Sequence, residues 1–360
     1  MPFRIAVIPG DGIGPEVIAQ GMRVLQAVTA ATGTELDFVG YDLGAERYLR
    51  TGEILPDSVF KELSEVDAIY LGAVGDPRVQ NPQYAAGLLL RLRFNLDLWV
   101  NLRPSWLLAP GLTPLRDAAS IDLVVVRENT EGGYVGIGGQ FKRGTSDEIA
   151  IQEDFNTHKG VERIQRYAFA LARERRAAGH RGRVTMVDKS NALYHAHDLW
   201  QRVFALQREA APDIEAEHLF VDAAAMQLVK DPARFDVVVT SNMFGDILSD
   251  LASELVGGLG QAPSANINPD NRRGLFEPVH GSAPKHAGKS IANPVGAILA
   301  GAMMLRHLGD ATGALHIEAA VMSAARDRKT TKDLGGTLST TAAADAVLER
   351  LERVESSRAS

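Results

Sequence analysis

Short, continuously apolar runs alternate along this chain with longer segments of helical periodicity. Val and Ile dominate the runs, and each run has the length of a strand. Strands without polar alternation are buried on both faces, which requires helices on both sides of a parallel sheet. The pattern therefore predicts an α/β fold. The expected strands are Arg4–Pro9, Ala68–Gly72, Ile121–Arg127, Arg183–Asp188 and Phe235–Ser241, and the expected helices include Gly14–Thr32, Thr157–Ala178 and Ala192–Ala210.

The length of 360 residues favours two lobes, because a single hydrophobic core stops growing at roughly 250–300 residues. One segment, Gly139–Glu153, interrupts the alternation with a turn between two extended stretches. It is either an excursion that contacts another subunit or a hairpin on the surface, and the sequence leaves both interpretations open.

Composition excludes several function classes. The 38 Lys and Arg residues are outnumbered by 45 Asp and Glu, and no basic block is present, which argues against nucleic-acid binding. Cysteine is absent, so disulfide scaffolds, thiolate zinc sites, iron–sulfur clusters and cysteine nucleophiles are excluded. No stretch approaches the roughly 18 apolar residues of a membrane span, and no signal-peptide core follows Met1, so we expect a cytoplasmic protein.

A glycine-rich turn, Gly10–Gly14, joins the first expected strand to the first expected helix. It is close to the dinucleotide-binding pattern G-x-G-x-x-G, but its third glycine comes one residue early. Pro15 suits the first turn of a helix. A Rossmann-type site and a plain strand-to-helix turn both fit this spacing.

Three arginines, Arg93, Arg103 and Arg127, flank apolar segments. A guanidinium group can bind a carboxylate through two hydrogen bonds, so these residues are candidates for holding an acidic substrate. The alternative is that they are solvated charges on buried stems.

Asp246 and Asp250 are the strongest candidates for a metal site. Their spacing places both carboxylates on one helix face, where they repel each other unless a cation lies between them. Asp222 follows another extended run and can supply a third oxygen ligand, a set that suits Mg²⁺ or Mn²⁺. The alternative is that the acidic pair merely complements a helix dipole.

Four blocks together resemble the isocitrate/isopropylmalate dehydrogenase family, the β-decarboxylating dehydrogenases. The resemblance runs from Ile8–Glu16 to Leu334–Gly336, nearly the whole chain. The tartrate, D-malate and 3-isopropylmalate branches are the most similar. The four most specific blocks are Asn101–Pro104, Arg127–Gly132, Asn242–Asp250 and Glu277–Pro284.

The resemblance implies a two-lobed α/β fold that differs from the Rossmann fold. Residues 1–100 with 256–360 would form a larger cofactor-binding lobe. Residues 101–255 would form a smaller lobe that carries the dimer contacts and the metal-site residues. The protein would be a homodimer, or a dimer of dimers, in which each active site takes residues from both subunits.

The resemblance also assigns roles to single residues. Tyr134 and Lys189 match the catalytic pair. Asp246 and Asp250 of one subunit would hold Mg²⁺ or Mn²⁺ with Asp222 of the other. The substrate would contact Arg93, Arg103, Arg127, Leu89 and Leu90. The cofactor, NAD or NADP, would contact Ile13, Asn191, Glu277, His280, Gly281, Ser282, Ala283, Pro284, Lys285, Asn293 and Lys332.

The implied reaction is the metal-dependent oxidative decarboxylation of a malate-type 2-hydroxy acid. The turn Gly87–Leu90 is apolar and would leave a third carboxylate unpaired, which favours 3-isopropylmalate, D-malate or tartrate over isocitrate or homoisocitrate. Arg91 could reverse this preference if it turned inward. A catalytically silent regulatory subunit is the alternative from another class, but no catalytic or metal position has been lost.

The cofactor preference depends on the residue after Pro284. Members that use NAD usually have an aspartate there, whose carboxylate accepts hydrogen bonds from the ribose and repels a 2′-phosphate. This chain has Lys285, and an ammonium group can pair with a phosphate. Lys332 falls near a second phosphate-contact position. The sequence therefore favours NADP, while NAD stays open if both lysines are solvated.

Overall fold

The computed structural model describes residues 2–116 and 120–356, and the chain divides into two compact units. Unit 1 consists of Met1–Leu98, Trp106–Ser120 and Ser253–Ser360. Unit 2 consists of Trp99–Ser105 and Ile121–Ala252. The assignment of cofactor, metal and dimer roles to separate lobes stays a prediction.

The sheet of unit 1 has the strand order β2-β1-β3-β12-β11. Strand β1 runs parallel to β2 and β3, with Ile5 opposite Ala68, and β12 runs parallel to β3, whereas β11 is antiparallel to β12. This order and the antiparallel pairing of β11 with β12 differ from a Rossmann sheet, so the Rossmann interpretation of the first glycine-rich turn is wrong. The strands are β1 (Phe3–Gly10), β2 (Leu36–Gly40), β3 (Ala68–Ala73), β11 (Pro263–Asn268) and β12 (Arg273–Pro278).

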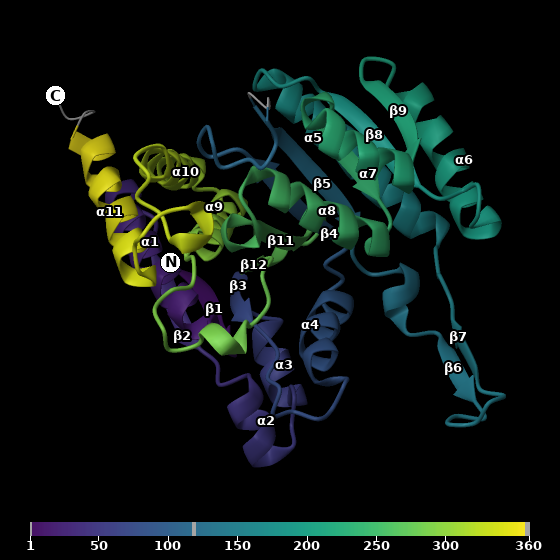
Figure 1. Ribbon diagram of the computed structural model, residues 1–360, viewed down its shortest axis with the longest axis horizontal. Helices are drawn as coiled ribbons and strands as arrows, with labels where there is room; N and C mark the ends of the chain where they lie inside the picture. Colours follow the sequence, from purple (N-terminus) through teal and green to yellow (C-terminus); the bar gives the residue numbers. More distant parts are fainter. Residues whose placement is uncertain (1, 117–119, 357–360) are drawn as a thin grey trace. The chain divides into compact units, whose positions relative to one another are not determined.

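Helices cover both faces of this sheet, as the apolar runs predict. On one face α9 packs against β11, β12 and β3, and it is joined there by α1, α10 and α11 (Figure 1). On the other face Ala6 and Ile8 of β1 lie in a core with Leu88 and Leu92 of α4. The helices are α1 (Gly14–Thr32), α2 (Ala45–Thr51), α3 (Asp57–Leu63), α4 (Tyr84–Asn95), α9 (Val295–Leu308), α10 (Ala311–Arg326) and α11 (Thr340–Ser356), with single 3-10 turns η3 (Leu259–Gln261), η4 (Pro284–His286) and η5 (Lys332–Leu334).

The sheet of unit 2 has the order β4-β5-β10-β8-β9, and β5, β10, β8 and β9 are parallel. All of β10 is buried, and so is every residue of β8 after its first. The strands are β4 (Val100–Trp106), β5 (Asp122–Glu128), β8 (Arg183–Asp188), β9 (Glu215–Phe220) and β10 (Val237–Thr240). The helices are α5 (His158–Ala177), α6 (Tyr194–Ala210), α7 (Val221–Lys230) and α8 (Asn242–Val256), with 3-10 turns η1 (Gly132–Val135) and η2 (Pro232–Arg234).

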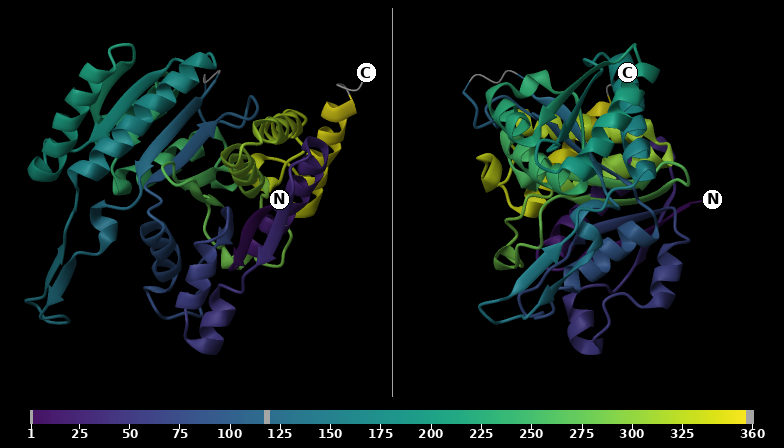
Figure 2. Two further views of the ribbon diagram at one scale, coloured as in Figure 1. Left: turned by 180° about the vertical axis from the view of Figure 1, so that it is seen from behind. Right: turned by 90° about the vertical axis from the view of Figure 1, so that its right-hand side faces the viewer.

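The segment Gly139–Glu153 forms a two-stranded antiparallel hairpin, β6 (Gly138–Phe141) with β7 (Ile149–Gln152). Both views of Figure 2 show this hairpin projecting from the rest of unit 2. Every residue of both strands is exposed, including Phe141, Ile149 and Ile151. Among the helices of the described residues, none combines the length and the apolar character that crossing a membrane requires.

Candidate active site

Arg127, the buried arginine near the end of β5, is tied to the first two turns of α8. Its Nε and Nη2 atoms donate to Asn242 Oδ1 at 3.0 and 2.7 Å, and its Nη1 atom pairs with Asp246. Helix α8 can come this close only because residue 245 is glycine, since a Cβ on Gly245 would lie 2.5 Å from Arg127 Cγ. The structure therefore joins a predicted substrate arginine to a predicted metal ligand.

Arg103 of β4 reaches the same helix. Its Nη1 atom donates to Ser249 Oγ at 2.9 Å and lies 3.1 Å from Asp246 Oδ1 and 3.4 Å from Asp250 Oδ1. The side chain of Arg103 is 9% exposed, whereas those of Asp246 and Asp250 are 38% and 51% exposed. Two aspartates that share one helix face thus have arginine charge beside them, and both side chains are partly exposed.

Tyr134, in η1, completes this cluster. Its hydroxyl donates to Asp246 Oδ2 at 2.8 Å, and the Arg127 guanidinium lies 5.1 Å above its ring. Burial, and then the hydrogen bond to Asp246, raises the pKa of Tyr134 above its usual value. The phenol is therefore held in its protonated form, as a proton donor must be.

Lys189 and Asp222 form a second, separate pair. Lys189 follows β8 directly, Asp222 is the second residue of α7, and Lys189 Nζ lies 2.5 Å from Asp222 Oδ1. The hydrogen bond from Lys189 lowers the pKa of Asp222. Within the described part of the chain, no three His, Asp or Glu side chains are close enough together to hold a metal ion. One chain thus contains two parts of the predicted site, and Asp222 does not join Asp246 and Asp250.

In unit 1, Arg93 near the end of α4 is buried and its Nη2 atom donates to Glu277 Oε1 at 3.0 Å. The same carboxylate oxygen accepts a hydrogen bond of 2.9 Å from Asn266 Nδ2. A predicted substrate residue and a predicted cofactor residue are therefore neighbours.

The apolar turn of α4 lies one to two turns before Arg93. Leu88 is buried in the core, whereas Leu89 and Leu90 are half-buried. Arg91 turns to the edge of its unit: its guanidinium donates to the Leu55 carbonyl, pairs with Asp57 and lies 5.2 Å over the Phe60 ring. The positive charge of Arg91 is thus already paired with Asp57.

The predicted cofactor loop is anchored to the first glycine-rich turn. The Ile13 N–H donates to the Ser282 carbonyl at 2.8 Å, and a Cβ on Gly12 would lie 1.9 Å from that oxygen. Beyond this anchor, residues 283–290 are all exposed, including Lys285. Asn293 donates to Asp333 Oδ2 at 2.8 Å, next to the exposed Lys332.

His280, Gly281 and Asn191 complete the predicted cofactor residues. Burial lowers the pKa of His280, which favours the neutral ring, and Nδ1 lies 3.0 Å from the Gly281 carbonyl. The Nε2 atom is buried and makes no hydrogen bond with the described residues. Asn191 is exposed in unit 2, just before α6.

Sequence reasoning missed residues that hold the site together rather than touch a ligand. Asp11 accepts hydrogen bonds from the N–H groups of Ala45 and Gly75 and from the Tyr84 hydroxyl, at 2.7, 2.7 and 2.8 Å, and Tyr84 begins α4. Asn242 accepts from Arg127 as described above. The only available signal was that both residues lie inside the recognised motifs.

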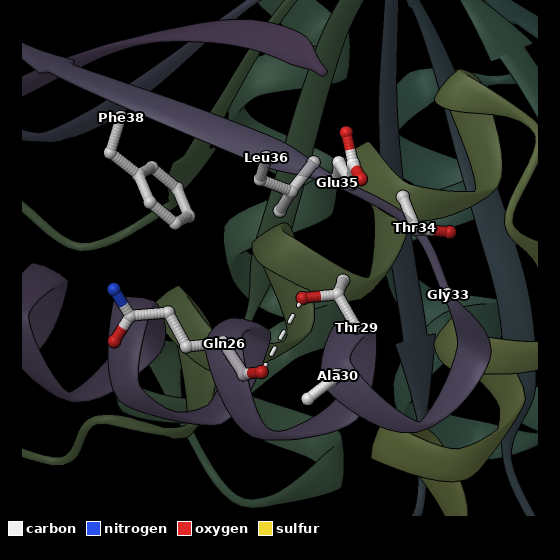
Figure 3. Close-up of a pocket in the computed structure, with 8 residues that line it drawn as sticks. All are labelled: Gln26, Thr29, Ala30, Gly33, Thr34, Glu35, Leu36 and Phe38. Atoms are coloured by element: carbon white, nitrogen blue, oxygen red, sulfur yellow. Dashed lines mark hydrogen bonds between the residues drawn. The ribbon is translucent and has the colours of Figure 1, made fainter. Parts of the chain in front are cut away.

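A surface groove lies elsewhere in unit 1, between α1 and β2, and Figure 3 shows the side chains that line it. No predicted site residue lines this groove. Its lining residues are Gln26, Thr29, Ala30, Gly33, Thr34, Glu35, Leu36 and Phe38.

Comparison with known proteins gives one consistent family. Residues 4–347 match the family model described as isocitrate/isopropylmalate dehydrogenase. The chain is 50% identical over 351 residues to a 3-isopropylmalate dehydrogenase of Thermobifida fusca, covering 97% of each chain. It is 51% identical over 327 residues to a 3-isopropylmalate dehydrogenase of Frankia casuarinae, covering 91% of this chain and 93% of that one.

Solved structures agree with this result. The crystal structure of an isocitrate dehydrogenase from Methylococcus capsulatus matches with a TM-score of 0.87 and 39% identity, over 97% of this chain and 99% of that one. The apo form of a β-decarboxylating dehydrogenase from Thermococcus kodakarensis matches with a TM-score of 0.80 and 36% identity, over 98% and 97% of the two chains.

Proposed function

This chain belongs to the isocitrate/isopropylmalate dehydrogenase family, and from that premise we propose that its substrate is 3-isopropylmalate. It is an oxidoreductase that oxidises and decarboxylates a malate-type 2-hydroxy acid, and its family uses NAD and a divalent cation, Mg²⁺ or Mn²⁺. The observation that carries the choice of substrate is the apolar turn of α4 with Arg91 turned away from it.

An isopropyl group needs an apolar wall, and Leu89 and Leu90 offer half-buried side chains one turn before Arg93. Isocitrate and homoisocitrate carry a third carboxylate that would need a cation on this turn. Arg91 is the only cation there, and its guanidinium is held by Asp57 and the Leu55 carbonyl. D-malate and tartrate lack the apolar group that such a wall would bind.

The residues present fit both cofactors. Asp246 and Asp250 offer partly exposed carboxylate oxygens, the ligands that Mg²⁺ and Mn²⁺ prefer. The buried Nε2 atom of His280, without a partner in the described residues, and the exposed segment 283–290 suit a dinucleotide. When bound, the cation lowers the pKa of the substrate hydroxyl and stabilises charge on its oxygen, while the nicotinamide accepts the hydride from C2.

The side chains would then act as follows. Arg93, Arg103 and Arg127 bind the substrate carboxylates. Lys189 Nζ, from the partner subunit, would accept the proton of the C2 hydroxyl as C2 becomes a carbonyl, and for this step it must be in its neutral amine form, without the proton that it shares with Asp222 in the ion pair. After the carboxylate on C3 has left as CO₂, the hydroxyl of Tyr134 donates a proton to C3, and its raised pKa keeps that proton available.

The separation of Asp222 and Lys189 from the Asp246 cluster supports a homodimer with shared sites. Asp222 is 63% exposed, so it is accessible to a second copy of the chain. The hairpin β6–β7 adds exposed apolar side chains, Phe141, Ile149 and Ile151, which a subunit contact would bury. Sedimentation velocity distinguishes a dimer from a dimer of dimers.

Steady-state kcat/KM values for 3-isopropylmalate, D-malate, tartrate, isocitrate and homoisocitrate test the proposal, each measured with NAD and with NADP in the presence of Mn²⁺. We expect 3-isopropylmalate to give the highest value with either nucleotide. A higher value for isocitrate would contradict the apolar wall. No turnover of any of the five acids by the intact dimer would instead favour the silent-subunit alternative.

A further inference from the structure

The backbone of Lys189 is fixed on both sides by the start of α6. Its N–H donates to the Nδ1 atom of His197 at 2.9 Å. Its carbonyl accepts hydrogen bonds from the N–H groups of Ala192 and Leu193, at 2.9 and 2.8 Å. The peptide from which the lysine side chain extends is therefore held by one imidazole and one turn of backbone.

The imidazole of His197 is itself oriented. A backbone N–H can only donate, so Nδ1 must be the accepting nitrogen and the ring proton lies on Nε2. Nε2 faces Asp154 Oδ2 at 3.5 Å, and the side chain of His197 is 1% exposed. The facing imidazole, and also the amide of Asn156, hold the pKa of Asp154 below its usual value. An ionised carboxylate thus favours the tautomer that can accept from Lys189.

The surroundings leave this ring little freedom. Phe244 meets it edge-on at 5.5 Å between ring centroids, and Trp200 lies 6.4 Å away. The Trp200 indole N–H donates to Asn156 Oδ1 at 2.8 Å, and Asn156 Nδ2 donates to Asp154 Oδ2 at 3.1 Å. The ring therefore lies between the lysine peptide, from which Nδ1 accepts a hydrogen bond, and the carboxylate of Asp154, which faces Nε2 at 3.5 Å without a hydrogen bond.

We propose that His197, oriented by Asp154, is a positioning residue for Lys189. This inference rests on the proposed function, because it gives Lys189 the role of proton acceptor. A lysine side chain has four methylene groups, so its ammonium position depends on where its backbone is anchored. A misplacement of about 1 Å at a reacting group can cost roughly 10²-fold in rate. In this proposal His197 contacts neither substrate nor cofactor, so its loss should lower kcat more than it changes KM.

The test compares two substitutions at one position. In His197→Asn, the amide oxygen can take the place of Nδ1 and accept from the Lys189 N–H, whereas His197→Leu fills space without an acceptor. We expect His197→Leu to lower kcat about 10- to 100-fold with KM within about threefold of wild type, and His197→Asn to restore kcat to within about threefold of wild type. His158→Leu, an exposed histidine at the start of α5, is the matched control.

Hydrogen exchange of the segment that contains the Lys189 amide gives a readout that is independent of catalysis. Its protection should fall in His197→Leu and stay close to wild type in His197→Asn. If His197→Leu does not fold, Asp154→Ala serves instead, with an expected several-fold loss of kcat at unchanged KM. Unchanged kcat and unchanged amide protection in the folded variants would overturn the proposal, as would equal losses in His197→Leu and His197→Asn. Failure of the proposed function would show separately, as a wild-type enzyme without turnover but with a protected amide.

Discussion

Replacing Lys285 with aspartate should change the choice between NADP and NAD. Lys285 lies in the exposed turn η4, three residues after Ser282, whose carbonyl anchors the loop to Ile13. The anchor is made by backbone atoms, so the substitution changes the charge at this position without removing the contact that holds the loop. An ammonium group there can pair with a 2′-phosphate, whereas a carboxylate repels it and accepts hydrogen bonds from ribose hydroxyls.

The magnitude follows from the exposure of the loop. A fully solvated ion pair contributes at most about 1 kcal/mol, and a charge-assisted hydrogen bond to phosphate about 1.5–3 kcal/mol. Because the carboxylate adds repulsion where the ammonium had added attraction, we expect a total change of about 1.5–3 kcal/mol. Each 1.4 kcal/mol is about one decade, so the NADP/NAD ratio of kcat/KM should fall by about one to two decades.

The assay is steady-state kinetics with both nucleotides at a saturating concentration of acid substrate and Mn²⁺. Lys289→Asp, four residues further along the same exposed loop, makes the same charge change and controls for the general electrostatic effect. We expect it to change the ratio by less than about threefold, since exposed charges at a distance are screened by salt. If both variants change the ratio equally, or Lys285→Asp leaves it unchanged, Lys285 does not contact the phosphate and the preference for NADP is refuted.

Three further predictions concern other residues. Asp250→Asn should lower kcat at least about 100-fold and weaken Mn²⁺ binding measured by electron paramagnetic resonance, whereas Glu254→Gln on the same helix should do neither. Arg91→Ala should leave kcat/KM for 3-isopropylmalate within about threefold, and a gain or loss of isocitrate turnover would show that its side chain reaches the substrate. Burial raises the pKa of Glu128 from 4.5 to about 7, so ionisation costs the folded state up to about 3 kcal/mol as the pH rises from 4.5 through 7. The free energy of unfolding of Glu128→Gln, relative to wild type, should therefore increase by that amount between pH 4.5 and 8 in urea titrations.

Much of the fold could be predicted from local patterns. Helix α1 and strand β8 have the predicted bounds, Gly14–Thr32 and Arg183–Asp188. In α1 the ends are marked by Pro15 at the first turn and by Gly33 in a left-handed conformation after the last. In β8 every residue but the first is buried, so the apolar run and the strand coincide.

Strand β11 could not be predicted in this way. All of Pro263–Asn268 is buried, yet Ser264, Asn266 and Asn268 are polar, so the segment lacks the continuous apolar run by which the other strands were predicted. The amide of Asn266 is satisfied by Glu277, and that of Asn268 by the Asp97 carbonyl. These partners lie 11 and 171 residues away in the chain. Burial of a polar strand depends on such tertiary partners, which periodicity does not reveal.

In the candidate site, too, local spacing was predictable and contacts between distant residues were not. The spacing of Asp246 and Asp250 places both on one helix face by local geometry alone, and the structure has them there beside Arg103. The contact of His197 with the Lys189 backbone spans eight residues and a change from strand to helix, so no spacing rule foretells it. The resemblance supplied Lys189 and Asp222, and their mutual pairing appears only in the structure.

These contacts also pair the charged side chains of the candidate site with one another. Arg103 pairs with Asp246 and Asp250, and Arg127 pairs with Asp246. Lys189 pairs with Asp222. Each cluster therefore holds equal numbers of positive and negative charges. Substrate carboxylates that bind the arginines would compete with Asp246 for them, which frees carboxylate oxygens at the moment a divalent cation needs them. A dianionic substrate and a dication also neutralise each other, so their joint binding leaves the total charge of the site unchanged. Binding either one alone would leave two uncompensated charges in a partly buried site, which is less favourable than binding both. The ion pairs among these side chains would thus favour binding of acid and metal together, and this coupling would be a property of the side chains that we propose for the chemistry.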